Sequence, residues 1–112
     1  MKISQIVELL DARTFTSEEL LENEVHSACG SDMMSDVLAF VKDQAVLLSG
    51  LLNTQTIRTA NMMDMRCVVL VRGKNPTPEM CSLAEDFGIA LSSTDYPMFK
   101  ACGLLYSAGL GH

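Results

Sequence analysis

A strand–turn–helix unit that recurs along the chain constrains the fold more than any other feature of the sequence. Its first clear copy is VHSACGSDMMSDVLAFV, residues 25–41, where a strand leads through a Gly-Ser-Asp turn into a helix. The pattern predicts further strands at residues 45–49, 65–71 and 89–91, and helices at residues 53–64, 77–87 and 96–107. This alternation predicts an α/β fold with three α/β/α layers and a mainly parallel sheet of four to five strands.

The individual segments carry the signals that such a sheet requires. Residues 45–49, AVLLS, are apolar on both faces, which is typical of a buried parallel strand. Residues 65–71, MRCVVLV, form the strongest strand pattern of the chain. A helix begins after Thr77 with Pro78 in its first position and ends at Gly88. These signals support a parallel sheet with helices on both faces.

The two ends of the chain depart from this rhythm. A first helix is expected at residues 2–10, followed by a short β segment at residues 13–16. One helical turn is expected at residues 17–21, capped by Thr16 or Ser17. The helix of the first unit should start at Ser31 or Asp32 and end near residues 42–43. Residues 108–112 should fray.

Composition limits the classes of function. The 112 residues suit one domain, residues 1–112, and 48% of them are hydrophobic, which allows a real core. The net charge of −6, with 14 acidic and 8 basic residues, argues against binding to nucleic acid or an anionic membrane. The N-terminal segment lacks the apolar run of a signal peptide, and no stretch reaches transmembrane length, so a cytoplasmic location is expected.

The residues that most often carry chemistry give little support for catalysis. The four cysteines form no C-x-x-C pair and lack metal-finger spacing, so no metal site is expected. Cys67, Cys81 and Cys102 fit small core positions, whereas Cys29 precedes a helix start that would favour its thiolate. His26 stands alone in a strand. We therefore expect no catalytic residues and no cofactor.

The turns that follow the strands are the expected place for a ligand. In open parallel sheets, ligands bind outside the carboxyl ends of the strands, near a switch in strand order. Small, hydroxyl and charged side chains at these turns suit a small anionic or nucleotide-like ligand. The candidate ligand-binding residues are Gly30, Ser31, Asp32, Ser49, Gly50, Asn53, Arg72, Thr94 and Asp95.

Helix capping alone is the alternative explanation for these turns. Ser, Asp, Asn and Thr are the residues that helix starts select, and an aspartate at a cap repels an anion. The sequence also lacks both nucleotide fingerprints, G-x-G-x-x-G and G-x-x-x-x-G-K-[ST]. The sequence alone does not decide between a ligand site and simple caps.

Paired methionines indicate a surface for protein contacts. Met33 adjoins Met34, and Met62 adjoins Met63. Two neighbouring residues on a helix cannot point at the same core layer, so one of each pair is expected at a subunit interface. A homodimer is the expected assembly.

Three motifs resemble those of a known family, the DRTGG domains. They are GSDMMSDVL at residues 30–38, RGKNPTPE at residues 72–79 and STDYPM at residues 93–98. The chain looks most like the free-standing form encoded beside iron hydrogenases, and the wider family is similar to the amino-terminal domain of the HPr serine kinase. Other members adjoin CBS domains and help regulated enzymes dimerise. The resemblance implies a non-enzymatic regulatory or assembly module.

The chain departs from the family at one turn. Many relatives carry Gly-Asp-Arg after the central strand, where this chain has Ser-Gly-Leu-Leu-Asn at residues 49–53. Two main hypotheses follow. The first is a dimeric regulatory domain that binds a small anion at the carboxyl edge of the sheet. The second is an assembly or partner protein of an iron-hydrogenase-type redox complex, with no ligand of its own.

Overall fold

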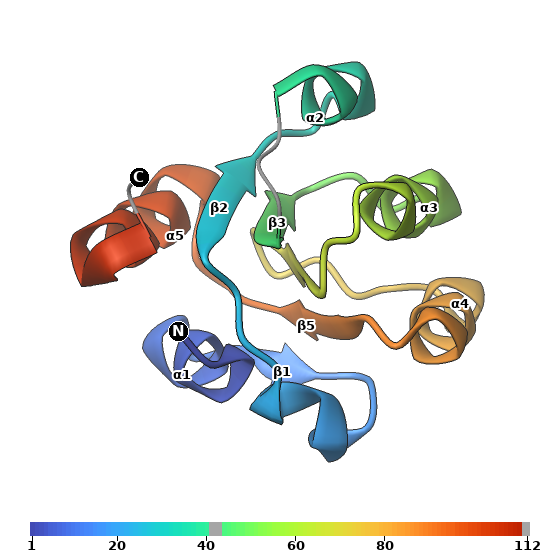
Figure 1. Cartoon of the computed structure of the whole chain (residues 1–112), viewed down its shortest axis with the longest axis horizontal. Coiled ribbons are helices and arrows are strands. Elements are labelled where there is room, and N and C mark those ends of the chain that lie inside the picture. The colour runs from blue at the N-terminus through green and yellow to red at the C-terminus, as the bar shows by residue number, and fades with distance from the viewer. Residues whose placement is uncertain (41–43, 111–112) are drawn as a thin grey trace.

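The computed structural model describes residues 1–40 and 44–110, and Figure 1 shows a sheet with helices on both of its faces. Strands β2 to β5 are parallel, and β1 runs antiparallel to β5 at the edge. The predicted α/β class, with a mainly parallel sheet, is confirmed. The strand order across the sheet is β1 (Arg13–Thr14), β5 (Ala90–Ser93), β4 (Cys67–Leu70), β3 (Ala45–Ser49) and β2 (Ser27–Gly30).

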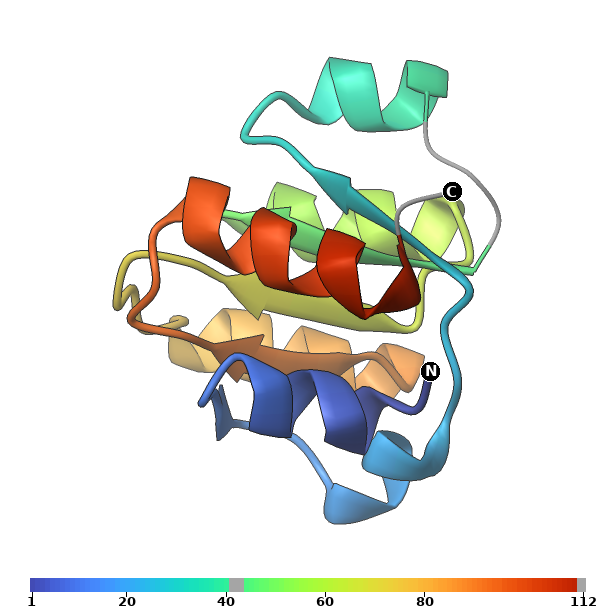
Figure 2. The same ribbon diagram turned by 90° about the vertical axis from the view of Figure 1, so that its left-hand side faces the viewer.

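The helices divide between the two faces of the sheet and give the predicted three layers (Figures 1 and 2). One face carries the first and last helices, α1 (Ile3–Leu9) and α5 (Met98–Leu105). The opposite face carries the three helices that connect the parallel strands: α2 (Met34–Phe40), α3 (Thr54–Met62) and α4 (Pro78–Phe87). Each of these three therefore crosses on the same side, as a constant crossover hand requires.

The sheet separates two hydrophobic clusters. Val46 and Leu48 pack on the side of α1 and α5, whereas Ala45 and Leu47 pack on the side of α2, α3 and α4. Every residue of β3 is buried, since both of its faces are covered. This explains the absence of polar alternation in AVLLS, as expected for a parallel strand.

Local signals placed the ends of two helices correctly. The Asn53 side chain accepts a hydrogen bond from the Gln55 N–H at 2.8 Å and caps α3. The Thr77 hydroxyl accepts from the Met80 N–H at 3.2 Å and caps α4. Gly88 ends α4 with φ +72°, in the left-handed region that glycine enters without strain.

The N-terminal segment closes one edge of the sheet. The expected helical turn is the 3₁₀ helix η1 (Glu18–Glu22), and Ser17 occupies its N-cap position without a capping hydrogen bond from its side chain. The Thr16 hydroxyl accepts from the Leu91 N–H at 3.0 Å, and the Ser17 hydroxyl donates to Glu85 at 2.8 Å. The Thr16 side chain therefore contacts β5, and the Ser17 side chain contacts α4. The pairing of β1 with β5 brings both residues next to these elements.

The C-terminal segment is more ordered than its sequence suggests. Helix α5 begins at Met98 after Pro97 and continues into the π-helical segment η2 (Tyr106–Leu110). Leu110 is buried against the cluster under α1 and α5, so the expectation of fraying is wrong at residues 108–110. Residues 111–112, and the helix end predicted at residues 42–43, lie outside the described residues.

None of the helices in the described part of the chain is long and apolar enough to cross a membrane.

Candidate functional site

The turns after the four parallel strands lie at one edge of the sheet, as predicted. Backbone hydrogen bonds continue past the strand ends and hold neighbouring turns together. The Ser31 N–H donates to the Leu48 carbonyl at 2.9 Å, and the Thr94 N–H donates to the Leu70 carbonyl at 2.8 Å. The Val71 N–H donates to the carbonyl of a candidate residue on the neighbouring strand, Ser49, at 3.1 Å. The fold thus places candidate residues that are distant in sequence side by side.

The expected switch in strand order is not present among the described strands. The parallel strands β2, β3, β4 and β5 lie next to one another in chain order, with their connecting helices on one face. A switch point would need neighbouring strands whose connections leave in opposite directions. The crevice that the ligand rule invokes therefore does not form, and the candidate site is an open edge.

Asp32 is the centre of the most connected cluster at this edge. Its Oδ1 accepts from the Gly50 N–H at 2.6 Å and from the Ser49 hydroxyl at 3.3 Å. Its Oδ2 lies 3.4 Å from Arg72 Nη2. The carboxylate thus joins the ends of β2, β3 and β4. We name these four residues, Asp32, Ser49, Gly50 and Arg72, the Asp32 cluster.

Arg72 adopts a backbone conformation that is rare for its residue type. Its φ is +61°, and Gly73 follows with φ +69°. The Arg72 N–H donates to the Tyr96 carbonyl at 2.9 Å, and the Gly73 N–H donates to Thr94 at 2.9 Å. A Cβ atom at Gly50 would overlap the Arg72 guanidinium. Glycine at position 50 therefore lets the guanidinium lie against the backbone beside Asp32.

The Asp32 cluster favours the ionised form of its carboxyl group. The hydrogen bond from the Gly50 N–H lowers the pKa of Asp32 from its ordinary value, and Arg72 and Ser49 act in the same direction against the effect of burial. Both charged side chains remain accessible, with 47% of Asp32 and 45% of Arg72 exposed. An ion can therefore reach either partner from solvent.

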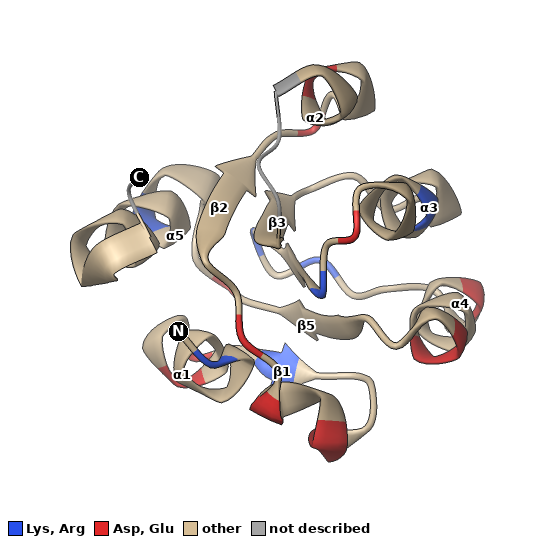
Figure 3. Cartoon of the chain, in the orientation of Figure 1, with Lys and Arg blue, Asp and Glu red and all other residues tan. Residues whose placement is uncertain are grey.

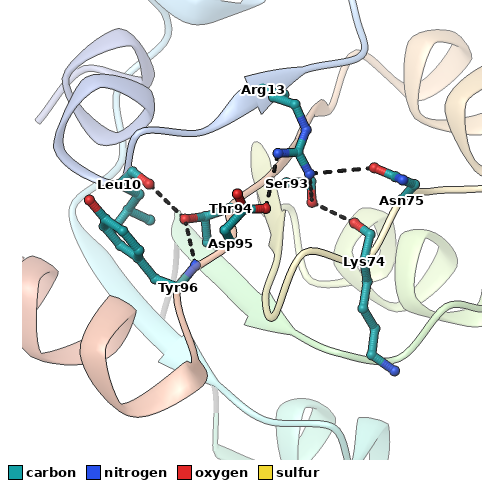
Figure 4. A network of polar contacts seen from close by, with 8 residues as sticks. All are labelled: Leu10, Arg13, Lys74, Asn75, Ser93, Thr94, Asp95 and Tyr96. Carbon is teal, nitrogen blue, oxygen red and sulfur yellow. Dashed lines mark hydrogen bonds and ion pairs between the residues drawn. The ribbon is translucent and has the colours of Figure 1, made fainter.

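Asp95 belongs to a second network, which Figure 4 shows. Its Oδ1 lies 3.0 Å from Arg13 Nη1, and Arg13 Nη2 donates to Ser93 at 3.3 Å and to Asn75 at 3.4 Å. The Lys74 side chain extends away from these contacts (Figure 4). Sequence reasoning missed Arg13 and Asn75, because only the antiparallel pairing of β1 with β5 brings Arg13 to this edge.

Three further candidates have structural roles. Thr94 is buried, and its hydroxyl donates to the Leu10 carbonyl at 2.6 Å and accepts from the Tyr96 N–H at 3.2 Å. Asn53 is the cap of α3. The Ser31 hydroxyl accepts from the Met33 N–H at 3.0 Å. For these three residues, the capping and turn explanation holds.

Asp32 and Asp95 are not simple helix caps. The hydrogen bonds of Asp32 run sideways to the neighbouring strands, while Ser31 serves the turn before α2. The cap position of α5 is Pro97, and its side chain makes no capping hydrogen bond. Helix capping therefore explains some of the predicted site residues. It does not explain Asp32 and Asp95, whose side chains bind other partners.

Gly30, two residues before Asp32, lines a cavity of about 190 Å³ between β2 and the C-terminal helices. A Cβ atom here would lie 2.6 Å from Cys102 Sγ and 3.2 Å from Met98 Sδ, so a large side chain would disturb α5. Cys29 also lines this cavity. Burial, followed by the neighbouring Cys102, raises the pKa of the Cys29 thiol, so the expected stabilisation of its thiolate is wrong.

In the described part of the chain, the lysines and arginines are distributed over several elements in Figure 3. Acidic residues gather on α4 and η1 in the same view. The cations at the carboxyl edge are thus a local feature of an acidic protein.

One methionine of each pair is exposed, as predicted. Met33 and Met62 are 60% and 69% exposed, whereas Met34 and Met63 pack against the cluster under α2, α3 and α4. The subunit interface expected at these positions stays a prediction.

The fold and its open edge define an α/β domain that presents charged and hydroxyl side chains where its parallel strands end. This domain has a DRTGG-like fold. Over 93% of its length it matches the crystal structure of the CBS and DRTGG domains of the regulatory region of a Clostridium perfringens pyrophosphatase, complexed with its activator diadenosine tetraphosphate. The TM-score is 0.74 and the sequence identity is 16%.

This similarity confirms the expected fold. The chain spans 45% of the length of that regulatory region. No family model matches the chain, and the search of curated proteins gives no match. The association with hydrogenases stays a prediction.

Proposed function

We propose that this chain is a non-enzymatic regulatory domain that binds a small anionic or nucleotide-like ligand at the carboxyl edge of its sheet. The observation that carries the proposal is the convergence of the Arg72 guanidinium, the Ser49 hydroxyl and the Gly50 N–H on one carboxylate, that of Asp32, at that edge. A guanidinium combined with a backbone N–H is a common way to hold a phosphate or carboxylate.

The structural neighbour gives a second line of support. The pyrophosphatase region with the similar fold is regulatory, and its activator, diadenosine tetraphosphate, is a nucleotide with a chain of phosphates. A ligand of the same chemical class would present phosphate oxygens to the Asp32 cluster. Because the cluster lies at an open edge, binding would depend on charge, and its affinity would fall as ionic strength rises.

A thermal-shift screen against nucleotides, inorganic polyphosphates and small carboxylates tests the proposal. A ligand at about 100 times its Kd adds about 2.7 kcal/mol of stability, which raises the Tm of a domain of this size by several degrees. Arg72→Gln should remove the shift. Unchanged melting of the wild-type protein across the whole panel would contradict the proposal.

Arg66→Gln is the matched control. Arg66 adjoins the amino end of β4, and its Nη2 lies 3.1 Å from Asp64 Oδ1. It is half-exposed and paired with an aspartate, as Arg72 is, but it lies at the opposite edge of the sheet. The two variants change the net charge equally, so only a site at the carboxyl edge would distinguish them.

A second candidate function is supported by the exposed apolar side chains. Phe99 is 91% exposed on α5, and Met33 and Met62 are exposed on the opposite face. Such residues favour a homodimer or a partner protein, including the iron-hydrogenase-type redox complex expected from the sequence, in the cytoplasm. In this case the turns would bind no ligand.

Charged replacements test this second candidate. Phe99→Glu should dissociate a complex that uses α5, and Met33→Glu with Met62→Glu should dissociate one that uses the other face. Sedimentation velocity of the purified chain measures self-association, and a pull-down from the native cell measures partner binding. Identical sedimentation and identical co-purifying proteins for all variants would exclude both surfaces.

A further inference from the structure

The Asp32 carboxylate occupies a set of donors that would suit an external anion. The Gly50 N–H, the Ser49 hydroxyl and the Arg72 guanidinium all reach it, at 2.6, 3.3 and 3.4 Å. These donors come from the ends of β3 and β4, whereas Asp32 follows β2. The three donors at the ends of two neighbouring strands thus form an anion-binding cradle. The carboxylate that occupies this cradle comes from the end of a third strand.

The cradle is fixed by the backbone around it. Arg72 is held in the left-handed region, which is strained for an arginine, by its N–H bond to the Tyr96 carbonyl. A Cβ atom at position 50 would overlap the guanidinium, so a side chain there would displace Arg72 from its present position. Neither feature is needed for an ordinary surface ion pair. Together they allow the guanidinium to lie beside Gly50 at the end of β3.

Asp32 is more exposed than two of the donors that surround it, Ser49 and Gly50, which are buried. It lies in the turn between β2 and α2, and almost half of its side chain is exposed. Rotation of this side chain into solvent would uncover all three donors without moving β3 or β4. A phosphate oxygen could then accept the same hydrogen bonds.

The geometry points to a self-occupied anion site, in which Asp32 fills the cradle of Ser49, Gly50 and Arg72 until a phosphate group of the ligand displaces it. This inference rests on the proposed function. It adds the position at which the phosphate would bind, and it identifies Asp32 as an internal competitor for that position. Asp32 then opposes binding in two ways. Its carboxylate must leave the donors, and its charge repels the incoming phosphate. Asp32 thereby raises the ligand concentration that is needed to fill the site.

Asp32→Asn is the central test, with inorganic tripolyphosphate as the probe. The amide retains an oxygen for the Gly50 N–H but loses the charge that pairs with Arg72 and repels phosphate. The variant should bind tripolyphosphate about tenfold more tightly than the wild-type protein, measured by calorimetric titration at fixed ionic strength. Gly50→Ala should weaken binding in either background, because it displaces the guanidinium.

Asp95→Asn provides the matched control. Asp95 lies at the same edge and pairs with Arg13 at 3.0 Å, and the substitution changes the net charge by the same amount. It accordingly measures how much affinity comes from general charge. The inference requires a larger gain for Asp32→Asn than for Asp95→Asn.

The outcomes separate the two proposals. Tighter binding by Asp32→Asn, with a change in the Gly50 amide resonance that tripolyphosphate reverses, supports the self-occupied site. Wild-type binding with equal gains for both aspartate variants overturns it and leaves the proposed function intact. Absence of binding by the wild-type protein and by every variant overturns both.

Discussion

Two buried hydroxyl groups, which lie two positions apart in the chain, should differ in what they contribute to stability. Thr94 donates to the Leu10 carbonyl at 2.6 Å and accepts from the Tyr96 N–H, whereas the Ser92 hydroxyl is buried with no hydrogen-bond partner among the described residues. A satisfied buried group and an unsatisfied one respond oppositely to removal, because only the first leaves partners without bonds.

We expect Thr94→Val to lower the free energy of unfolding by about 1 to 3 kcal/mol, since Leu10 and Tyr96 lose a buried partner. Ser92→Ala should leave stability unchanged or raise it slightly, because it removes an unpaired polar atom. Urea unfolding of both variants measures the difference. A larger loss for Ser92→Ala than for Thr94→Val would show that these hydrogen bonds are wrongly assigned.

Asp32 gives the molecule a specific response to acid. Its pKa in the folded state is lowered, chiefly by the Gly50 N–H, so its contribution to stability is present above the unfolded pKa, near 3.8. That contribution is lost as the pH falls through the folded pKa. Because the side chain is half-exposed, we expect it to be below about 1 kcal/mol.

The comparison of wild type with Asp32→Asn isolates this effect. The difference in unfolding free energy should be constant near neutral pH and should shrink as the pH falls below about 4. Urea titrations at a series of pH values provide the measurement. A difference that remains the same at the lowest pH would mean that the Asp32 charge contributes nothing to folding.

Two glycines in helical segments have opposite effects on their elements. Gly88 ends α4 with φ +72°, and Gly103 lies inside α5, and a Cβ atom would meet no heavy atom within 4 Å at either position. Substitution therefore tests backbone conformation without a packing change. Gly88→Ala should destabilise the protein by about 1 kcal/mol, and Gly103→Ala should stabilise it by about 0.5 to 1 kcal/mol.

Thermal unfolding of the two single variants and of the double variant checks this pair of predictions. The double variant should melt close to the wild-type protein, because the sites are independent and their effects oppose each other. Stabilisation by Gly88→Ala would mean that the end of α4 does not need the left-handed conformation.

Elements whose signals are local could be predicted from the sequence. Asn53, Thr77 and Gly88 bond within one helical turn of their own positions, and all three were placed correctly. The partners of the candidate aspartates could not be predicted in this way. Asp32 meets Arg72 across 40 positions of the chain, and that contact depends on which strands are neighbours.

The N-terminal segment shows the same limit. Arg13 reaches Asp95 across 82 positions, because β1 joins the sheet antiparallel to β5. The short β pattern at residues 13–16 indicated a strand but not its neighbour. Leu110 likewise has no distinctive sequence context, and only the packing of the C-terminal segment against the sheet buries it. Contacts between segments that are distant in the sequence therefore determine which candidate residues come together.

At the scale of the whole molecule, we expect the central strand of the sheet to become exposed to solvent only when the entire domain unfolds. Strand β4 is the middle one of the five strands in the described part of the chain, and all of its residues are buried. Cys67 begins this strand, and burial raises the pKa of its thiol to about 12. Cys81 lies on α4 and is only half-buried. The Cys67 thiol therefore reports on unfolding of the sheet, and the Cys81 thiol reports on smaller fluctuations near the surface.

We expect iodoacetamide to alkylate Cys67 in the native protein at least about a thousand times more slowly than in the unfolded chain, because the reaction must wait for global unfolding. Cys81 should react through smaller fluctuations of α4. Site-resolved mass spectrometry at increasing urea concentrations measures both rates. The Cys67 rate should rise with the same dependence on urea as the unfolding equilibrium, and the Cys81 rate should rise less steeply. Equal rates at both cysteines without urea would mean that β4 separates from its neighbours while the rest of the sheet stays folded, and the carboxyl edge could not then hold the Asp32 cluster in a fixed arrangement.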